Sequence, residues 1–365
     1  MNYNKNKNEF FLNEKNKLIN QNLSQEYNKI KFKNKNVKYA VIIIVFSVLF
    51  FYRSKRFHED LNNIHIAMSL NDNYTYPIMV SITSIILNSN KNTFIEFHIL
   101  IGKDVKTRNQ KKISSLKRLN HNIKFSFHHV GNNFNGWIHG KKKLTVASFY
   151  RSIAAELIKN VDKIIYLDGD ILAYGDLSEM YQLNMDNFYF RGVREILPRE
   201  VEAKIDRSRY ICAGVMVMNL KLIRKDHVFK TFKKYYLKYF NKKKYYGDQH
   251  IINTLFRDKI NFLPPKFGTW FMNKKYIKKY KSLKPIVYST KELIEANKNP
   301  IIRHLWGTTE EGLLLKNKPW LIKKPCGIKK EWQYYAKKTG YYSSICKTYK
   351  NACLIKKHLH EKQFK

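Results

Sequence analysis

Short apolar runs alternate with stretches of helical periodicity along residues 60–325. The runs are rich in β-branched and aromatic residues, which is typical of buried strands. The stretches between them repeat apolar residues every three or four positions, as amphipathic helices do. We expect strands at residues 64–70, 94–101, 123–130, 163–167, 188–193, 210–220 and 301–304. We expect helices from Pro77 onward and at residues 105–119, 144–159, 229–240, 251–256 and 329–338.

The order of these elements predicts the fold class. Strands and helices alternate through the first half of the chain, which indicates a parallel sheet with right-handed crossovers. The expected class is α/β and Rossmann-like, with a mixed, mostly parallel central sheet flanked by helices. The sequence lacks G-x-G-x-x-G after the first predicted strand and lacks G-x-x-x-x-G-K-[ST] throughout. The phosphates of a bound nucleotide would therefore be held by a metal ion and basic side chains.

The amino-terminal part of the chain has a different pattern. Residues 1–36 are rich in Asn and Lys without periodicity, which predicts a disordered basic tail. Residues 39–52 are apolar or aromatic except for Ser47. We interpret residues 37–56 as a signal-anchor transmembrane segment. The excess of lysines before it predicts a cytoplasmic amino terminus and a single-pass type II topology.

This apolar run has alternative interpretations because of its length. It has 14 residues, whereas a bilayer-spanning helix usually needs about 17–25. An uncleaved signal-type segment and a buried helix are the alternatives. The remaining chain divides into a folded domain at residues 60–325 and a basic helical extension at residues 326–365.

The charge balance suggests a class of partner but does not fix one. Lys and Arg number 69 against 28 acids, a formal net charge of +41. Such a charge alone would suggest nucleic acid or an anionic surface as partner. Because the lysines are spread over every segment, we interpret much of the charge as compositional and expect no specific nucleic acid. Of the cysteines, Cys212 lies in an apolar run and is expected in the core, while a disulfide among Cys326, Cys346 and Cys353 is left open.

The strand at residues 163–167 is followed by a pair of carboxylates. Asp168 and Asp170 come directly after it, separated by Gly169. Open α/β sheets bind ligands at the carboxyl ends of their strands. Carboxylate oxygens are the ligands that Mg²⁺ and Mn²⁺ prefer, and glycine lets a ligand approach the backbone. Taken alone, an Asp-Gly-Asp sequence more often marks a simple turn that ends a strand.

A family resemblance extends the interpretation of this turn. It rests on six stretches of the sequence, which are HIAMSLNDNYTYP, the Tyr150-Arg151 helix, KIIYLDGDILAYGDLSEM, CAGVMVMNL, GDQHIINTLF with FLPPKF, and IIRHLWG with KPW. In this order they resemble glycosyltransferase family 8, which includes bacterial lipooligosaccharide galactosyltransferases and glycogenin. The resemblance covers about residues 64–320. It implies a GT-A fold, a UDP-sugar donor, Mn²⁺ or Mg²⁺ as metal, and transfer with retention of anomeric configuration.

The resemblance also implies roles for individual residues. Asp168 and Asp170 correspond to the metal-binding D-x-D pair, and His304 to the third ligand. Arg151, Asp248 and Gln249 are implied in catalysis beside the transferred sugar. The donor-binding set implied is Asn71, Asn73, Tyr74, Arg151, Asp168, Gly169, Asp170, Gly307 and Lys318.

Several of these residues have plainer interpretations from the sequence alone. His304 would then be an ordinary histidine, Arg151 one basic residue of a helix face, and Asp248 a helix cap. The insertion TTEEGLLLKN after Gly307 makes Lys316 a rival of Lys318.

The sequence departs from the family pattern at one more position. Cys212 occupies a position where several members have an asparagine that contacts the sugar. No second acidic residue takes an obvious nucleophile position, so we expect a front-face substitution rather than the two-carboxylate arrangement of retaining hydrolases.

We therefore expect a retaining UDP-sugar-dependent hexosyltransferase of the Golgi or endoplasmic reticulum. It would transfer glucose or galactose to a glycan, glycolipid or glycoprotein acceptor. The alternatives are a glycogenin-like self-glucosylating enzyme and a catalytically inactive basic protein that binds polyanions or membranes.

Overall fold

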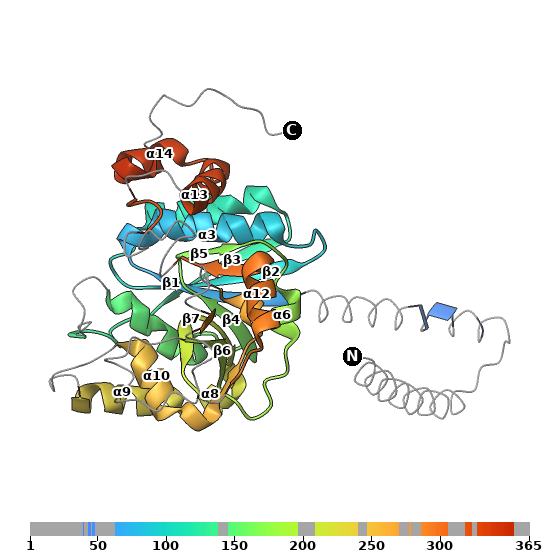
Figure 1. The fold of residues 1–365 in the computed structure, drawn as a ribbon, viewed down its shortest axis with the longest axis vertical. Coiled ribbons are helices and arrows are strands. Elements are labelled where there is room, and N and C mark those ends of the chain that lie inside the picture. The colour runs from blue at the N-terminus through green and yellow to red at the C-terminus, as the bar shows by residue number, and fades with distance from the viewer. Residues whose placement is uncertain are drawn as a thin grey trace. The chain divides into compact units, whose positions relative to one another are not determined.

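The computed structural model describes most of the chain after residue 62 (Figure 1). The described ranges are 63–137, 145–195, 209–239, 247–269, 277–278, 286–305, 318–322 and 327–353, together with Tyr39, Ile43, Ile44, Phe46 and Ser47. The chain divides into two compact units, Met1–Leu61 and Asn62–Lys365. The tail predicted at residues 1–36 lies outside the described residues.

The predicted membrane anchor is not found. Five residues of the 37–56 segment are described, and they are helical. In the part of the chain that the structure describes, no helix combines the length and the apolar character needed to cross a bilayer. The predicted signal anchor is therefore not supported, and the type II topology with a Golgi or endoplasmic reticulum localisation that depended on it is wrong.

The larger unit is built on a seven-stranded sheet. Its order is β3-β2-β1-β4-β7-β6-β8. The first four strands in this order run parallel, β7 is antiparallel to both of its neighbours, and β8 is parallel to β6. The predicted mixed, mostly parallel sheet is confirmed. The strands are β1 (Asn63–Leu70), β2 (Phe94–Ile101), β3 (Ile123–His129), β4 (Lys163–Leu167), β6 (Phe190–Arg194), β7 (Ile211–Asn219) and β8 (Ile260–Phe262).

Helices cover both faces of this sheet because each strand alternates its side chains between them (Figure 1). Ile64 and Ile66 of β1 pack with Ile82 of α3 in one apolar cluster. Ala67 of the same strand packs with Phe149 in a second cluster on the opposite face. The first face carries α3 (Thr75–Asn88) and α4 (Thr107–Ser114), and the second carries η3 (Val146–Ile153), α5 (Ala154–Leu157), α8 (Leu220–Lys225), α9 (Val228–Tyr239) and α10 (Asp248–Leu255).

A further layer packs on the outside of α3. Helix α13 (Gly327–Lys338) places Trp332 against Trp320 and α3, in a third apolar cluster. Helix α14 (Tyr342–Thr348) follows it, and a disulfide joins Cys346 to Cys353. The sequence left this pairing open. The other short elements are η1 (Asp72–Tyr74), η2 (Ser115–Leu119), α6 (Ser178–Gln182), η4 (Arg257–Lys259), η5 (Pro265–Phe267), α12 (Thr290–Lys298) and η6 (Lys350–Ala352).

The helix predicted at residues 144–159 is different in detail. The described part is a 3₁₀-helix, η3, followed by the single-turn α5. Ser148 and Ser152 donate their hydroxyls to carbonyls three residues back, which favours the tighter turn. Periodicity alone cannot distinguish this element from an α-helix, because both place residues three apart on one side.

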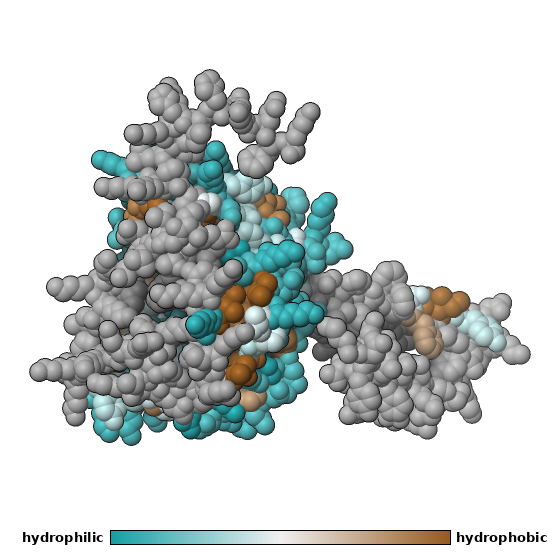
Figure 2. Space-filling view, viewed as in Figure 1, coloured by the Kyte–Doolittle hydropathy of each residue, from teal (hydrophilic) through white to brown (hydrophobic). Residues whose placement is uncertain are grey.

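The described surface is largely polar. Figure 2 shows that the described residues on this face are mostly hydrophilic, with small separate apolar patches. The large exposed apolar side chains of the bigger unit include Ile286, Ile294 and Leu321, each at least 45% exposed.

Candidate active site

The D-x-D carboxylates lie at the carboxyl end of β4. The backbone N–H of Asp168 donates to the carbonyl of Gly214 in β7, 2.8 Å away. The chain then turns through Gly169 into β5 (Ile171–Ala173), which pairs antiparallel with β9 (Ile302–His304). This pairing sets Ile171 opposite His304. Asp170 and His304, which are 134 positions apart in sequence, are thus brought together by the small two-stranded sheet.

Asp168, Asp170 and His304 form a group that can hold a metal ion. Nε2 of His304 lies 3.3 Å from Oδ1 of Asp170 and 4.0 Å from Oδ2 of Asp168. One donor atom from each residue falls within a 4.8 Å cluster. A Cβ on Gly214 would lie 2.7 Å from Oδ2 of Asp168 and 2.5 Å from Cε1 of His304, so only glycine fits there. The residues present fit a small divalent cation with open positions for further oxygen ligands.

Positive charges within the site stabilise its buried carboxylates in the absence of a metal. Burial acts to raise the pKa of Asp170, but the charges of Lys318 and His304 outweigh it and lower that pKa. Burial would lower the pKa of His304, yet the neighbouring Cys212 and Asp170 raise it well above its usual value. A cation bound at this site would compete with a proton for Nε2 of His304.

Arg151 connects the metal-binding group to α10. Its guanidinium lies 2.9 Å from Oδ1 of Asp168 and 2.9 Å from Oδ2 of Asp248. It also donates to the carbonyl of Ala213 and lies over the ring of Tyr166. Arg151 and Asp248 are only 4% and 5% exposed, so this is a buried network rather than a helix-face cation.

The amino end of α10 holds the two residues implied beside the sugar. Gly247 has φ 86°, a left-handed conformation that favours glycine, and it directs the chain into the helix at Asp248. Oε1 of Gln249 accepts from the backbone N–H of Ala213 at 2.9 Å. Asn253 bonds to both backbone groups of Ile211. These contacts fix Asp248 and Gln249 against β7, opposite Asp168.

Lys318 also reaches the site. Its ammonium donates to Oδ2 of Asp170 and, at 3.1 Å, to the carbonyl of Leu305. The rival Lys316 and the predicted Gly307 lie outside the described residues.

The predicted nucleotide contacts follow the carboxyl end of β1. Asn71 caps η1 by accepting from the N–H of Tyr74 at 3.1 Å. Tyr74 packs edge-on against Trp320. A Cβ on Gly169 would lie 3.0 Å from the ring of Tyr74. Asn73 is exposed, and its carbonyl accepts from the hydroxyl of Tyr349. The structure therefore brings together at one sheet edge all the predicted site residues that it describes.

One buried acid at this edge was missed by the sequence reasoning. Glu195 follows β6, is 8% exposed, and interacts with Cys212, whose Sγ lies 3.4 Å from Nδ1 of His304. Burial raises the pKa of Glu195 to about 7. The charge of His304 and a hydrogen bond with Cys212 lower this pKa and offset part of the rise. The sequence held no signal for it, because only the structure shows that β6 runs in the same direction as β4 and that its carboxyl end shares that edge.

This acid predicts a pH-dependent stability. The folded protein keeps the proton of Glu195 between about pH 4.5 and 7, whereas the unfolded chain releases it. The free energy of unfolding therefore falls as pH rises through that window, and the loss is complete above it. We expect Glu195→Gln to stabilise the metal-free protein at pH 8 by roughly 2–3 kcal/mol and to have no effect below pH 4.5.

Urea unfolding in the presence of a chelator measures this effect. Glu156→Gln is the control, because Glu156 is an exposed residue of α5. Equal pH slopes for the native protein and Glu195→Gln would contradict the prediction.

Comparison with known proteins decides the family. The model of glycosyl transferase family 8 matches residues 65–321. The chain belongs to glycosyltransferase family 8. The sequence resemblance is thereby confirmed, and the site described above lies within the matched part of a glycosyltransferase.

Individual members of the family are distant in sequence. A lipopolysaccharide 1,2-glucosyltransferase of Escherichia coli K12 is 24% identical over 70% of this chain and 79% of its own length. A lipopolysaccharide 1,3-galactosyltransferase of Salmonella typhimurium is 23% identical over 59% of this chain and 66% of its own. The solved structure of the galactosyltransferase LgtC with donor and acceptor sugar analogues has TM-score 0.62 at 19% identity, covering 75% of this chain and 96% of LgtC. That likeness shows a GT-A-like fold.

Proposed function

We propose that this family 8 member is a retaining UDP-sugar-dependent hexosyltransferase that transfers glucose or galactose with Mn²⁺ or Mg²⁺. The observation that carries the proposal is the convergence of Asp168, Asp170 and His304 with the Arg151–Asp248 pair at one sheet edge. A nucleotide diphosphate needs both a cation and fixed basic groups, and this edge provides sites for both. The family relationship supports a nucleotide sugar as donor.

Each residue has a defined task in this proposal. Asp168, Asp170 and His304 would hold the cation, which neutralises the diphosphate of the leaving group when bound. Lys318 would bind the diphosphate, because its ammonium lies within the site, paired with Asp170. Asp248 would accept hydrogen bonds from sugar hydroxyls, held in position by Arg151. Gln249 would lie beside the anomeric carbon.

The acceptor is proposed from the relatives alone. Two of the named relatives are lipopolysaccharide glycosyltransferases. We propose a glycan or glycolipid acceptor of that type, with a glycoprotein as the further possibility to be tested.

A donor screen tests the proposal. The full chain is incubated with each common UDP-sugar, with and without Mn²⁺, and UDP release is measured. We expect slow Mn²⁺-dependent hydrolysis of one donor, and NMR of the transferred sugar should show retention. The absence of both UDP release and metal-dependent UDP binding by calorimetry would overturn the enzyme proposal.

Lys318 provides a second, finer test. Because its ammonium occupies one oxygen of Asp170, it competes with a cation for that carboxylate. We expect Lys318→Met to bind Mn²⁺ about 3–10-fold more tightly without nucleotide, and to bind UDP more weakly with Mn²⁺ present. Electron paramagnetic resonance of free Mn²⁺ measures the first quantity and calorimetry the second. Lys330→Met, at an exposed position of α13, should change neither.

A further inference from the structure

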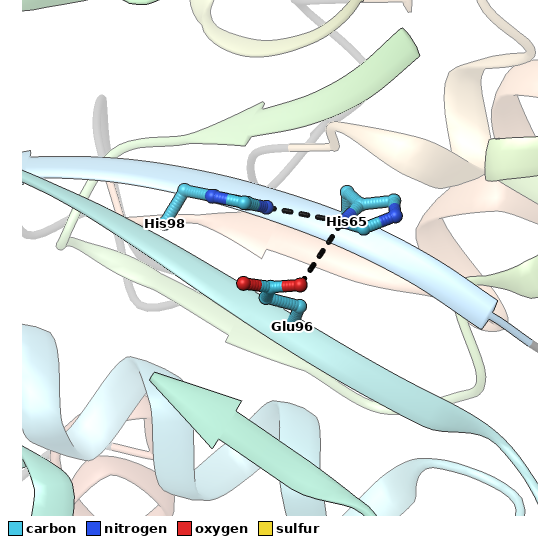
Figure 3. Close-up of side chains that lie close together, drawn as sticks. All are labelled: His65, Glu96 and His98. Atoms are coloured by element: carbon cyan, nitrogen blue, oxygen red, sulfur yellow. Dashed lines mark hydrogen bonds and ion pairs between the residues drawn. The ribbon is translucent and has the colours of Figure 1, made fainter. Parts of the chain in front are cut away.

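A second group of metal-ligating side chains lies on the sheet away from the D-x-D site. It consists of His65 on β1 and Glu96 and His98 on β2 (Figure 3). The parallel register pairs His65 with Glu96, and His98 lies two residues further along β2 on the same face. His65 and Glu96 are the third residues of their strands and His98 is the fifth residue of β2, whereas the D-x-D site lies beyond the carboxyl end of β4.

The donor atoms of this group converge. Nδ1 of His65 lies 3.0 Å from Nε2 of His98 and 3.8 Å from Oε2 of Glu96, as the dashed lines in Figure 3 mark. All three donor atoms fit within 4.8 Å of one another. Two imidazole nitrogens bound to one tetrahedral Zn²⁺ would be about 3.3 Å apart. Rotations of the two imidazole rings and of the Glu96 side chain would turn these three donor atoms toward one ion.

Neighbouring groups orient the ligands in the manner of a metal site. Nδ1 of His98 lies 3.0 Å from Nε2 of His128 on β3. If Nδ1 of His98 donates that bond, its Nε2 keeps a free lone pair directed at His65. The hydroxyl of Ser126 donates to Oε1 of Glu96 at 2.6 Å, which leaves Oε2 on the side of His65.

An ion can reach this group from solvent, and the charge of Glu96 can partly neutralise it there. The side chains of His65 and Glu96 are 17% and 13% exposed, so one side remains accessible for the ion and a water ligand. Lys124 pairs with Oε1 of Glu96 at 2.9 Å, but its side chain is 58% exposed and can turn into solvent. Burial lowers the pKa of His65 and of His98, which favours neutral imidazoles.

We propose that His65, Glu96 and His98 form a second divalent-cation site, of the Zn²⁺ type, which clamps β1 to β2. Two imidazoles and one carboxylate suit Zn²⁺ or Co²⁺, whereas the two carboxylates of the D-x-D group suit Mn²⁺ or Mg²⁺. The two sites thus differ in ligand chemistry as well as in position. This site requires no glycosyl transfer, so it stands independently of the proposed function.

Metal titration in a background without the first site tests the proposal. The full-length Asp170→Asn protein is stripped with a chelator and titrated with Zn²⁺ by calorimetry and with Co²⁺ by visible absorption. We expect one Zn²⁺ per chain, a Co²⁺ spectrum of low coordination number, and a higher melting temperature with Zn²⁺. Adding His65→Gln or Glu96→Gln should weaken binding at least about tenfold.

The control and the contrary outcomes are defined by the same titration. His129→Gln removes an exposed histidine at the end of β3 that is outside the group, and it should leave binding unchanged. Circular dichroism without metal shows whether each variant is folded. If His65→Gln is unfolded, Glu96→Gln serves as the second variant, because glutamine keeps an oxygen that accepts from Ser126. Absence of Zn²⁺ binding in Asp170→Asn would overturn the proposal, since the group would then be only a hydrogen-bonded imidazole chain. Binding that survives both substitutions would overturn it as well.

Discussion

Replacing Asp170 with asparagine is expected to reduce metal-dependent turnover of the UDP-sugar by roughly a thousandfold or more. Asp170 faces His304 through one oxygen and Lys318 through the other, so we expect its charge to serve both a bound cation and the lysine. Asparagine has nearly the same shape but loses this charge. Without it, a cation would lose an anionic ligand, and the diphosphate would lose the cation that neutralises it. UDP release and Mn²⁺-dependent UDP binding measure the two consequences separately.

The matched control for this substitution is Asp162→Asn. Asp162 lies just before β4, and its side chain is 70% exposed in weak ion pairs with Lys221 and Arg224. Exposed pairs of this kind contribute about 0–1 kcal/mol, so turnover should be unchanged. Retained turnover in Asp170→Asn, with native melting behaviour, would contradict the assignment of the D-x-D pair.

The sequence predicted the strands well because their signals are local. Apolar runs at residues 64–70 and 94–101 differ from β1 and β2 by at most one residue. The place of Asp168 at a strand end was equally local. The antiparallel direction of β7 was not assigned from the pattern, since a buried central strand is apolar on both faces whichever way it runs.

The candidate site was harder to predict because it depends on long-range packing. Family resemblance alone pointed to His304, and the register of β5 with β9 now explains its nearness to Asp170. Glu195 was missed since nothing in the sequence says that β6 runs in the same direction as β4. The ion pair of Arg151 with Asp248 was also unpredicted, because it joins η3 to α10 across the edge of the sheet.

The second large effect is expected for Arg151→Met. Arg151 is almost completely buried and pairs with both Asp168 and Asp248. Methionine fills similar space but leaves these carboxylates without their counter-charge. Breaking a buried pair on one side typically costs about 3–5 kcal/mol, whereas exposed substitutions stay within about 0.5 kcal/mol. We expect a loss of that larger size in the free energy of unfolding, measured with urea at pH 7.

The response to metal distinguishes this loss from simple damage to the core. If Asp168 binds a cation, Mn²⁺ supplies part of the missing positive charge, so it should stabilise Arg151→Met more than it stabilises the native protein. Arg108→Met, at an exposed position of α4, should change neither the stability nor the effect of Mn²⁺. A destabilised Arg151→Met protein that Mn²⁺ does not stabilise would mean that Asp168 is not a metal ligand. Arg151 would then act only as a structural link between η3 and α10.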